Sequence, residues 1–105
     1  MPGASEPSIV VDAWNVPDGS QEEFLSAMVA LMERLRELDG FRDGQILTGV
    51  NHTQFVSWAT FDSMQAREAA YVDPEIGEML RRLGGLARPR PHAYRVARRF
   101  APREP

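Results

Sequence analysis

Residues 9–16, IVVDAWNV, and residues 54–61, QFVSWATF, decide the fold that this sequence predicts. Both stretches are rich in β-branched and aromatic residues, which are typical of β-strands. A helical pattern follows each of them, and a further short apolar strand is predicted after each helical pattern, at 45–50 and 92–100. The order is therefore strand, helix, strand, stated twice. This is the split βαββαβ arrangement of a ferredoxin-like α+β fold.

The first helical pattern has a signal at each end. Ser20 and Glu23 have the spacing of a capping box, and Gly40 is placed to end the helix in a left-handed conformation. Asn51-His52-Thr53 then predicts a hairpin turn between the second and third strands. Between Ser20 and Gly40, apolar residues recur at helical spacing: Phe24, Met28, Leu31, Leu35 and Leu38.

The second helical pattern is predicted in two pieces. Asp62 or Ser63 can cap the first piece, and Asp73-Pro74-Glu75 restarts the helix with a capping residue, a proline at the first helical position and an acid in the first turn. Gly84-Gly85 is expected to end it. Arg88-Pro89-Arg90-Pro91 is expected to form an extended connector before the last strand.

The composition indicates one ordinary globular domain. The chain has 105 residues and a formal net charge of −3, so nothing in the overall charge indicates nucleic acid as a partner. We expect a flexible tail at 1–8, one domain at 9–100 and a second tail at 101–105. No apolar run is long enough to span a membrane and no signal peptide is recognisable, which predicts a cytoplasmic protein.

The missing residue types exclude several kinds of chemistry. The sequence has no cysteine, and all 12 of its basic residues are arginine. Disulfides, thiolate catalysis, cysteine-bound metals, Schiff bases and the phosphate-loop lysine are therefore excluded. The two histidines, His52 and His92, have no partners at metal-ligand spacing. We expect no metal and no bound cofactor.

Four polar or aromatic side chains and one valine on the first and third strands are the candidates for a site. Strand alternation predicts one shared face for Asp12 and Trp14, and another for Gln54, Val56 and Trp58. We expect Asp12 to lie on the same sheet face as Gln54 and Trp58, so that an acid, an amide and an indole could meet above one sheet. Burial would raise the pKa of the Asp12 carboxyl and make it a usable base, although it can equally be a structural hydrogen-bond acceptor. Gln54 can stabilise an oxyanion, or it is simply an edge residue.

The opposite strand faces are also apolar, which predicts a partner. Two helices cover only one face of a four-stranded sheet, so the other face is expected to pair with a second copy as a homodimer. Methionines on the helices are expected in the core, or around a flat apolar ligand: Met28, Met32 and Met79.

The sequence resembles the antibiotic biosynthesis monooxygenase family of dimeric α+β barrels, from about Val10 to Phe100. Four stretches carry the resemblance: residues 11–17 followed by Glu23-Phe24, Asp39-Gly40-Phe41, residues 54–58, and Asp73-Pro74-Glu75. In family members that oxygenate anthrone-type polyketides, the substrate is deprotonated and its carbanion reduces dioxygen without metal, haem or flavin. The resemblance places Asp12 and Gln54 where those enzymes have pocket asparagines, and Trp58 at their pocket tryptophan.

Three functions follow as alternatives. The first is a cofactor-independent monooxygenase for an aromatic polyketide-type molecule, with Asp12 as base, Gln54 as oxyanion donor, Trp58 stacking on the substrate, and O2 as co-substrate. The second is a cyclase or isomerase that uses Asp12 as base. The third is a dimeric binding or stress protein without turnover. The haem-degrading branch of the family is not favoured, because no histidine lies in the second helical region.

Overall fold

The computed structural model describes residues 6–50 and 53–103 of the chain. Its elements in chain order are β1 (Ser8–Asn15), α1 (Gln21–Leu35), β2 (Phe41–Thr48), β3 (Gln54–Phe61), α2 (Met64–Tyr71), α3 (Pro74–Leu86) and β4 (Arg88–Tyr94). The predicted tails fall only in part on this region, because residues 1–5 and 104–105 lie outside it. The predicted turn residues Asn51 and His52 also lie outside it.

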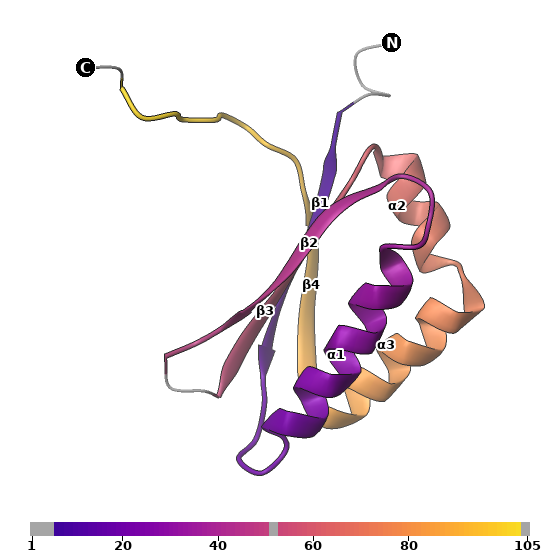
Figure 1. Ribbon diagram of the computed structural model, residues 1–105, viewed down its shortest axis with the longest axis vertical. Coiled ribbons are helices and arrows are strands. Elements are labelled where there is room, and N and C mark those ends of the chain that lie inside the picture. The colour runs from indigo at the N-terminus through magenta and orange to yellow at the C-terminus, as the bar shows by residue number, and fades with distance from the viewer. Residues whose placement is uncertain (1–5, 51–52, 104–105) are drawn as a thin grey trace.

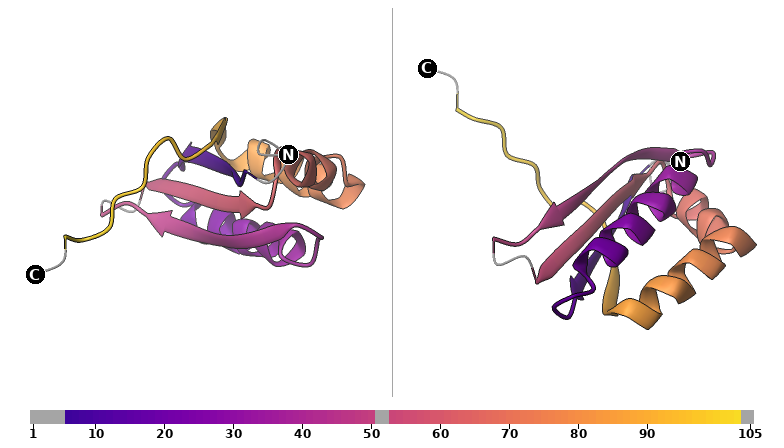
Figure 2. Two further views of the ribbon diagram at one scale, coloured as in Figure 1. Left: turned by 90° about the horizontal axis from the view of Figure 1, so that it is seen from above. Right: turned by 60° about the horizontal axis from the view of Figure 1, so that its bottom comes forward.

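The strands form one antiparallel sheet in the order β2-β3-β1-β4. All three helices lie on the same side of this sheet (Figures 1 and 2). The predicted α+β, ferredoxin-like arrangement is thereby confirmed. None of the described helices is long and apolar enough to cross a membrane.

The register between β1 and β3 assigns each side chain to a face. Asp12 lies opposite Ser57, and Trp14 lies opposite Phe55. These residues are all buried, so they point toward the helices. The alternate positions point to the open face, where Val11 lies opposite Trp58.

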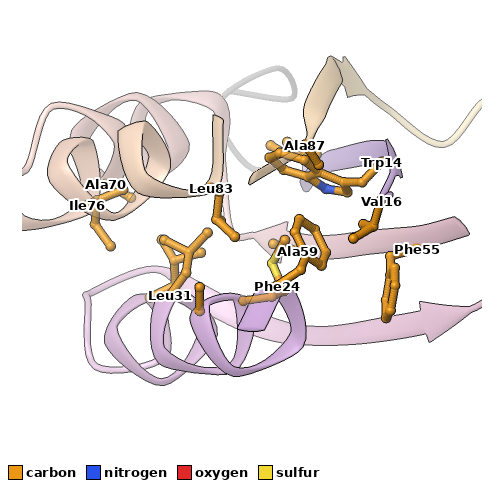
Figure 3. Close-up of a cluster of buried hydrophobic side chains, with 14 of the residues drawn as sticks. Trp14, Val16, Phe24, Leu31, Phe55, Ala59, Ala70, Ile76, Leu83 and Ala87 are labelled. Atoms are coloured by element: carbon orange, nitrogen blue, oxygen red, sulfur yellow. The ribbon is translucent and has the colours of Figure 1, made fainter. Parts of the chain in front are cut away.

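The core between sheet and helices contains two groups of aromatic rings, and Figure 3 shows the group around Phe24. The Phe24 ring is fully buried, and its centroid lies 5.3 Å from that of Trp14 and 5.1 Å from that of Phe55. Toward the other end of β3, the Phe61 ring lies 6.0 Å from Tyr71. These rings pack α1 and α2 against the two central strands.

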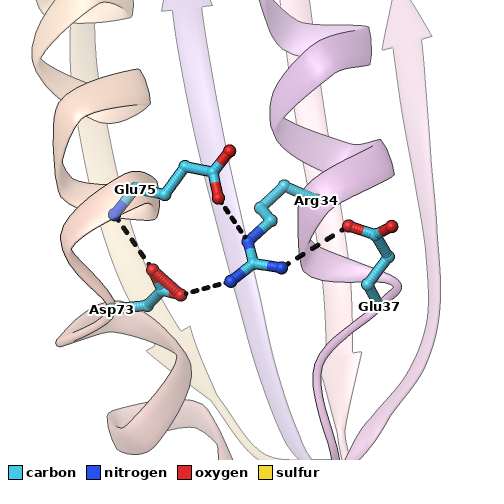
Figure 4. Close-up of polar contacts among 4 residues, drawn as sticks. All are labelled: Arg34, Glu37, Asp73 and Glu75. Carbon is cyan, nitrogen blue, oxygen red and sulfur yellow. Dashed lines mark hydrogen bonds and ion pairs between the residues drawn. The ribbon is translucent and has the colours of Figure 1, made fainter.

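An ion-pair group joins the end of α1 to the start of α3 (Figure 4). The Arg34 guanidinium lies 2.8 Å from an Asp73 oxygen, 3.0 Å from Glu75 and 3.5 Å from Glu37. Asp73 also caps α3, because its carboxylate accepts a hydrogen bond from the Glu75 backbone N–H at 2.9 Å. Although burial opposes it, hydrogen bonds from the Glu75 N–H and from Arg34 hold the pKa of Asp73 below its usual value.

Two predicted caps are confirmed and one is wrong. The Ser63 side chain accepts a hydrogen bond from the Ala66 N–H and starts α2, and Asp73 with Pro74 starts α3. Ser20 is the N-cap of α1, but its side chain makes no capping hydrogen bond, so the predicted capping box is absent. α1 also ends at Leu35 and does not reach Leu38.

The limits of β2, α3 and β4 differ from the prediction. β2 begins at Phe41 and not at 45, and α3 continues through Gly84-Gly85 to Leu86. The predicted connector 88–91 is the first half of β4, which ends at Tyr94 and not at Phe100. β4 is an edge strand, and Pro89 and Pro91 are two residues apart. The N–H groups that they lack therefore lie on one side of the strand, which an edge tolerates. Residues 95–103 leave the sheet as an exposed segment (Figure 1).

Gly40 is required where the chain turns from α1 into β2. Its φ is +86°, and a Cβ at this position would lie 2.5 Å from the Ala66 Cβ of α2. The left-handed conformation favours glycine, and the close approach leaves no space for a methyl group.

Replacement of Gly40 by alanine is expected to destabilise the protein by about 1–2 kcal/mol or more. The matched control is Gly84→Ala, because Gly84 lies within α3 and a Cβ there would meet nothing within 4 Å. The control is expected to stabilise the protein by about 0.5–1 kcal/mol. Urea denaturation of both variants measures the difference, and equal effects would contradict the analysis of Gly40.

Candidate active site

Three polar residues are buried on the helix-facing side of the sheet. Ser8, Asp12 and Ser57 are each 7–8% exposed, although their neighbours on this face are apolar. Ser8 and Asp12 come from β1, and Ser57 comes from β3. A carboxyl group in such a position is uncommon unless it has a structural or chemical task.

Asp12 and Ser57 lie directly opposite each other on the two central strands. The Trp14 indole N–H donates a hydrogen bond to the Ser57 Oγ at 3.1 Å. A hydroxyl that accepts one hydrogen bond can still donate its own proton. Ser57 is therefore a fixed donor next to a carboxylate, on the face where Gln54 was expected to supply this donor.

Tyr71 and Arg67 bring α2 into the same region. They are four residues apart, so they lie on one face of the helix. The Arg67 Nε donates a hydrogen bond to the Ser8 Oγ at 2.9 Å. Burial and the Asp12 charge raise the pKa of the Tyr71 hydroxyl to about 12, although Arg67 acts in the opposite direction. We call Ser8, Asp12, Ser57, Arg67 and Tyr71 the inner polar cluster.

The inner polar cluster combines a carboxylate, a cation and neutral hydroxyl groups in a largely apolar setting. A buried carboxylate can accept a proton from a weak carbon or oxygen acid. Ser57 and Tyr71 can donate hydrogen bonds to an oxyanion that develops beside it. This is the arrangement required for formation of an enolate or a stabilised carbanion. Among the described residues, no three acidic or histidine side chains come together as a metal-ligand group.

The predicted meeting of Asp12 with Gln54 and Trp58 is wrong. β3 turns Phe55 and Ser57 toward the helices, so Gln54 and Trp58 point to the opposite, open face. There the Trp58 indole N–H lies 3.3 Å from the Thr60 hydroxyl. Any action of Gln54 or Trp58 on a ligand would take place across the sheet from Asp12, and their predicted roles stay predictions.

The remaining predicted residues are divided among several places. Trp14, Gln54 and Val56 line one hollow of about 890 Å³ at the end of the sheet where α3 joins β4. Met28 is buried in the core, as its helical spacing indicated. Met32 lines a hollow of about 480 Å³ between α1 and β2, whereas Met79 borders a shallow hollow beside Glu78, Arg81 and Arg82 on α3. The three methionines thus do not surround one ligand pocket.

Sequence reasoning missed Ser57, Tyr71 and Arg67. The signal for Ser57 was present, since it lies between the apolar residues Phe55 and Ala59 on one strand face. Nothing in the sequence indicated Tyr71 or Arg67, because only the tertiary packing of α2 brings Tyr71 close to Asp12 and Arg67 to Ser8. The residues of β3 that face inward are Phe55, Ser57, Ala59 and Phe61, and not Gln54 and Trp58.

Solved structures share this fold, although no protein-family model and none of the curated proteins matches the sequence. SnoaB, a cofactor-independent oxygenase from Streptomyces nogalater, superimposes with a TM-score of 0.85 at 19% identity, over 93% of this chain and 99% of SnoaB. A protein from Deinococcus radiodurans described as a candidate antibiotic biosynthesis monooxygenase gives 0.81 at 13% identity, over 92% and 99%. One from Nitrosomonas europaea with the same description gives 0.79 at 14%, over 89% and 92%. At these identities the likeness establishes the fold.

The raised pKa of Tyr71 predicts a loss of stability at alkaline pH. From about pH 10 to about pH 12 the unfolded chain releases the Tyr71 proton while the folded chain retains it, so the free energy of unfolding falls as pH rises. The loss over this range amounts to up to about 2–3 kcal/mol. It should disappear in Tyr71→Phe and become smaller in Asp12→Asn. Urea unfolding across this pH range tests it, with the exposed Tyr94→Phe as control. An unchanged slope in Tyr71→Phe would refute the assignment.

Proposed function

We propose that this protein is a cofactor-independent monooxygenase that oxidises an aromatic, polyketide-type molecule, with Asp12 as the general base. The observation that carries the proposal is the buried Asp12 carboxyl, opposite Ser57 and close to Tyr71, in a fold shared with a cofactor-independent oxygenase. The fold alone would not choose a function. The cluster adds the acid-base chemistry that the reaction needs.

The proposed reaction starts with the transfer of a proton from an activated CH2 group of the substrate to the Asp12 carboxylate. The resulting carbanion, delocalised onto a ring oxygen, is stabilised by hydrogen bonds from Ser57 and Tyr71. It reduces O2 by one electron and combines with the resulting superoxide to form a peroxide anion on the same carbon. This anion takes back the proton held by Asp12, which gives a hydroperoxide and restores the Asp12 carboxylate. Loss of water then leaves a carbonyl group, so that CH2 and O2 become C=O and H2O. The substrate supplies all the electrons, and no cofactor is required.

A second candidate uses the same residues without oxygen. Asp12 as base and Ser57 as oxyanion donor would also serve a cyclase or isomerase that forms an enolate. The two candidates agree about the first proton transfer and differ only in what the carbanion attacks. Oxygen consumption therefore separates them, whereas a protein without turnover would show neither reaction.

Replacement of Asp12 by asparagine should lower the rate of anthrone oxidation by roughly a hundredfold or more, because the amide cannot take the proton. The fold should persist, since the amide keeps the shape of the carboxyl group. An oxygen electrode with an anthrone as substrate measures the rate, and circular dichroism monitors folding.

Asp39→Asn is the control, because Asp39 is an exposed acid outside the inner polar cluster. This variant should retain the rate of the parent. If Asp12→Asn is as fast as the parent, Asp12 is not the base. If the parent consumes no oxygen but converts the anthrone to another product, the cyclase or isomerase reading is favoured.

We also propose that two copies of the chain pair through the open faces of their sheets. In the described part of the chain no helix covers this face, and it carries apolar side chains that are only partly buried (Figure 2). Val11 and Trp58 face each other there, next to Val56, and Leu47 on β2 is 44% exposed. Association with a second sheet would remove this surface from water.

A charge at the centre of the open face should prevent this pairing. Light scattering is expected to give the mass of a dimer for the parent and of a monomer for Val56→Asp. The control Val72→Asp places the same charge at a residue that is 78% exposed on the helix side, and it should remain dimeric. A monomeric parent at micromolar concentration would refute the proposal.

A further inference from the structure

A cleft lies at one end of the sheet, next to the inner polar cluster. Its lining residues come from the start of β1, from α2 and from the end of β4, and Figure 1 shows these segments at the same end of the sheet. Its volume is about 380 Å³, which is within the range of small-molecule sites. Ser8 and Arg67 line it, and both belong to the inner polar cluster.

The charge on Arg67 is directed at this cleft in a fixed orientation. Its Nε is held by the Ser8 hydroxyl at 2.9 Å, so one edge of the guanidinium is occupied. A guanidinium has further N–H donors, which suit the two oxygens of a carboxylate. None of the ion pairs formed among the described residues includes Arg67. A partly buried cation of this kind is a natural place for an anionic ligand group.

Of the charged residues that line the cleft, Arg67 is the best placed to bind an anion. Arg95 adds positive charge, but its side chain is 79% exposed and lies 3.9 Å from the Glu6 carboxylate. Glu6 would repel an anion at that end. Met64, Pro7 and Ala93 supply apolar surface between the two ends, and Tyr94 adds an aromatic ring. The cleft therefore combines an apolar wall with one oriented cation.

We propose that Arg67 binds a carboxylate group of the substrate, so that the enzyme prefers an aromatic acid to a neutral anthrone. The inference rests on the proposed function, in which the reacting carbon lies at Asp12. Arg67 and Tyr71 share one face of α2, and Arg67 is close enough to Tyr71 to influence its pKa. A substrate held by its carboxylate at Arg67 would extend toward Tyr71 and Asp12. In this arrangement Arg67 fixes the position of the substrate and takes no part in proton transfer.

The test measures binding without turnover. The probes are a dihydroxyanthraquinone and the same ring system with one carboxyl group, and the signal is quenching of the fluorescence of Trp14 and Trp58. The parent is expected to bind the carboxylated probe roughly tenfold more tightly or better, as for a charge-assisted hydrogen bond. Arg67→Met should lose this preference and keep its affinity for the neutral probe. Arg67→Lys should retain a part of it.

Arg82→Met is the control, because it removes an exposed arginine on α3 and should leave the preference intact. A parent that binds both probes equally would overturn the proposal, as would a preference that persists in Arg67→Met. If Arg67→Met does not fold, a salt titration of the parent decides. A preference that falls with added salt supports an ionic contact, and one that does not change overturns it.

The binding test and the oxygen assay fail independently. If the parent consumes no oxygen but still prefers the carboxylated probe, the monooxygenase proposal is refuted and the proposed anion site at Arg67 is supported. If the parent oxidises a neutral anthrone but does not prefer the carboxylated probe, the anion site is refuted and the monooxygenase proposal is supported. With both activities present, the ratio of kcat/KM for the carboxylated substrate to kcat/KM for the neutral substrate should fall about tenfold in Arg67→Met.

Discussion

The register between β1 and β3 is the constraint on which the rest of this structure depends. Side chains alternate along a strand, so the pairing of Asp12 with Ser57 places both of these residues on the helix side. A shift of β3 by one residue would place Gln54 and Trp58 on that side instead. The buried aromatic pairs hold this register in place, since Trp14 and Phe55 both pack on Phe24. The polar residues of the site are thus located by the packing of their apolar neighbours.

The break between α2 and α3 completes the site. α2 is short and is capped by Ser63, and the chain restarts at Asp73, which Arg34 ties to the end of α1. Two short helices can follow directions that one long helix could not, so α2 lies over the start of β1 while α3 packs along α1. Arg67 and Tyr71 reach the sheet for this reason. The ion pairs around Arg34 therefore support the site without belonging to it.

The two faces of the sheet have separate proposed tasks. The helix side holds a carboxyl, hydroxyl groups and an arginine within an apolar core, which suits chemistry on a small acidic molecule. The open side holds partly buried apolar residues around Trp58, which suits association with a second sheet. The proposed pairing would account for apolar residues on both faces of the strands, since the helices cover one face and a second sheet would cover the other. It also places Gln54 and Trp58 at the proposed interface and away from the base.

Local signals in the sequence determined the order of the elements, the limits of β3 and the caps at Ser63 and Asp73, because each depends on residues close together in the chain. They also identified Asp12 as the candidate base. Only the tertiary structure decided which side chains accompany it. Periodicity shows that side chains alternate between the two faces of a strand. It does not show which residues of a neighbouring strand point to the same face of the sheet. The tertiary structure also decided the conformation of β4. Its prolines predicted an extended connector, but they are tolerated in a strand because β4 lies at the edge of the sheet. Pairing between distant segments, and not local preference, brought Ser57 and Tyr71 to Asp12 and Arg67 to Ser8.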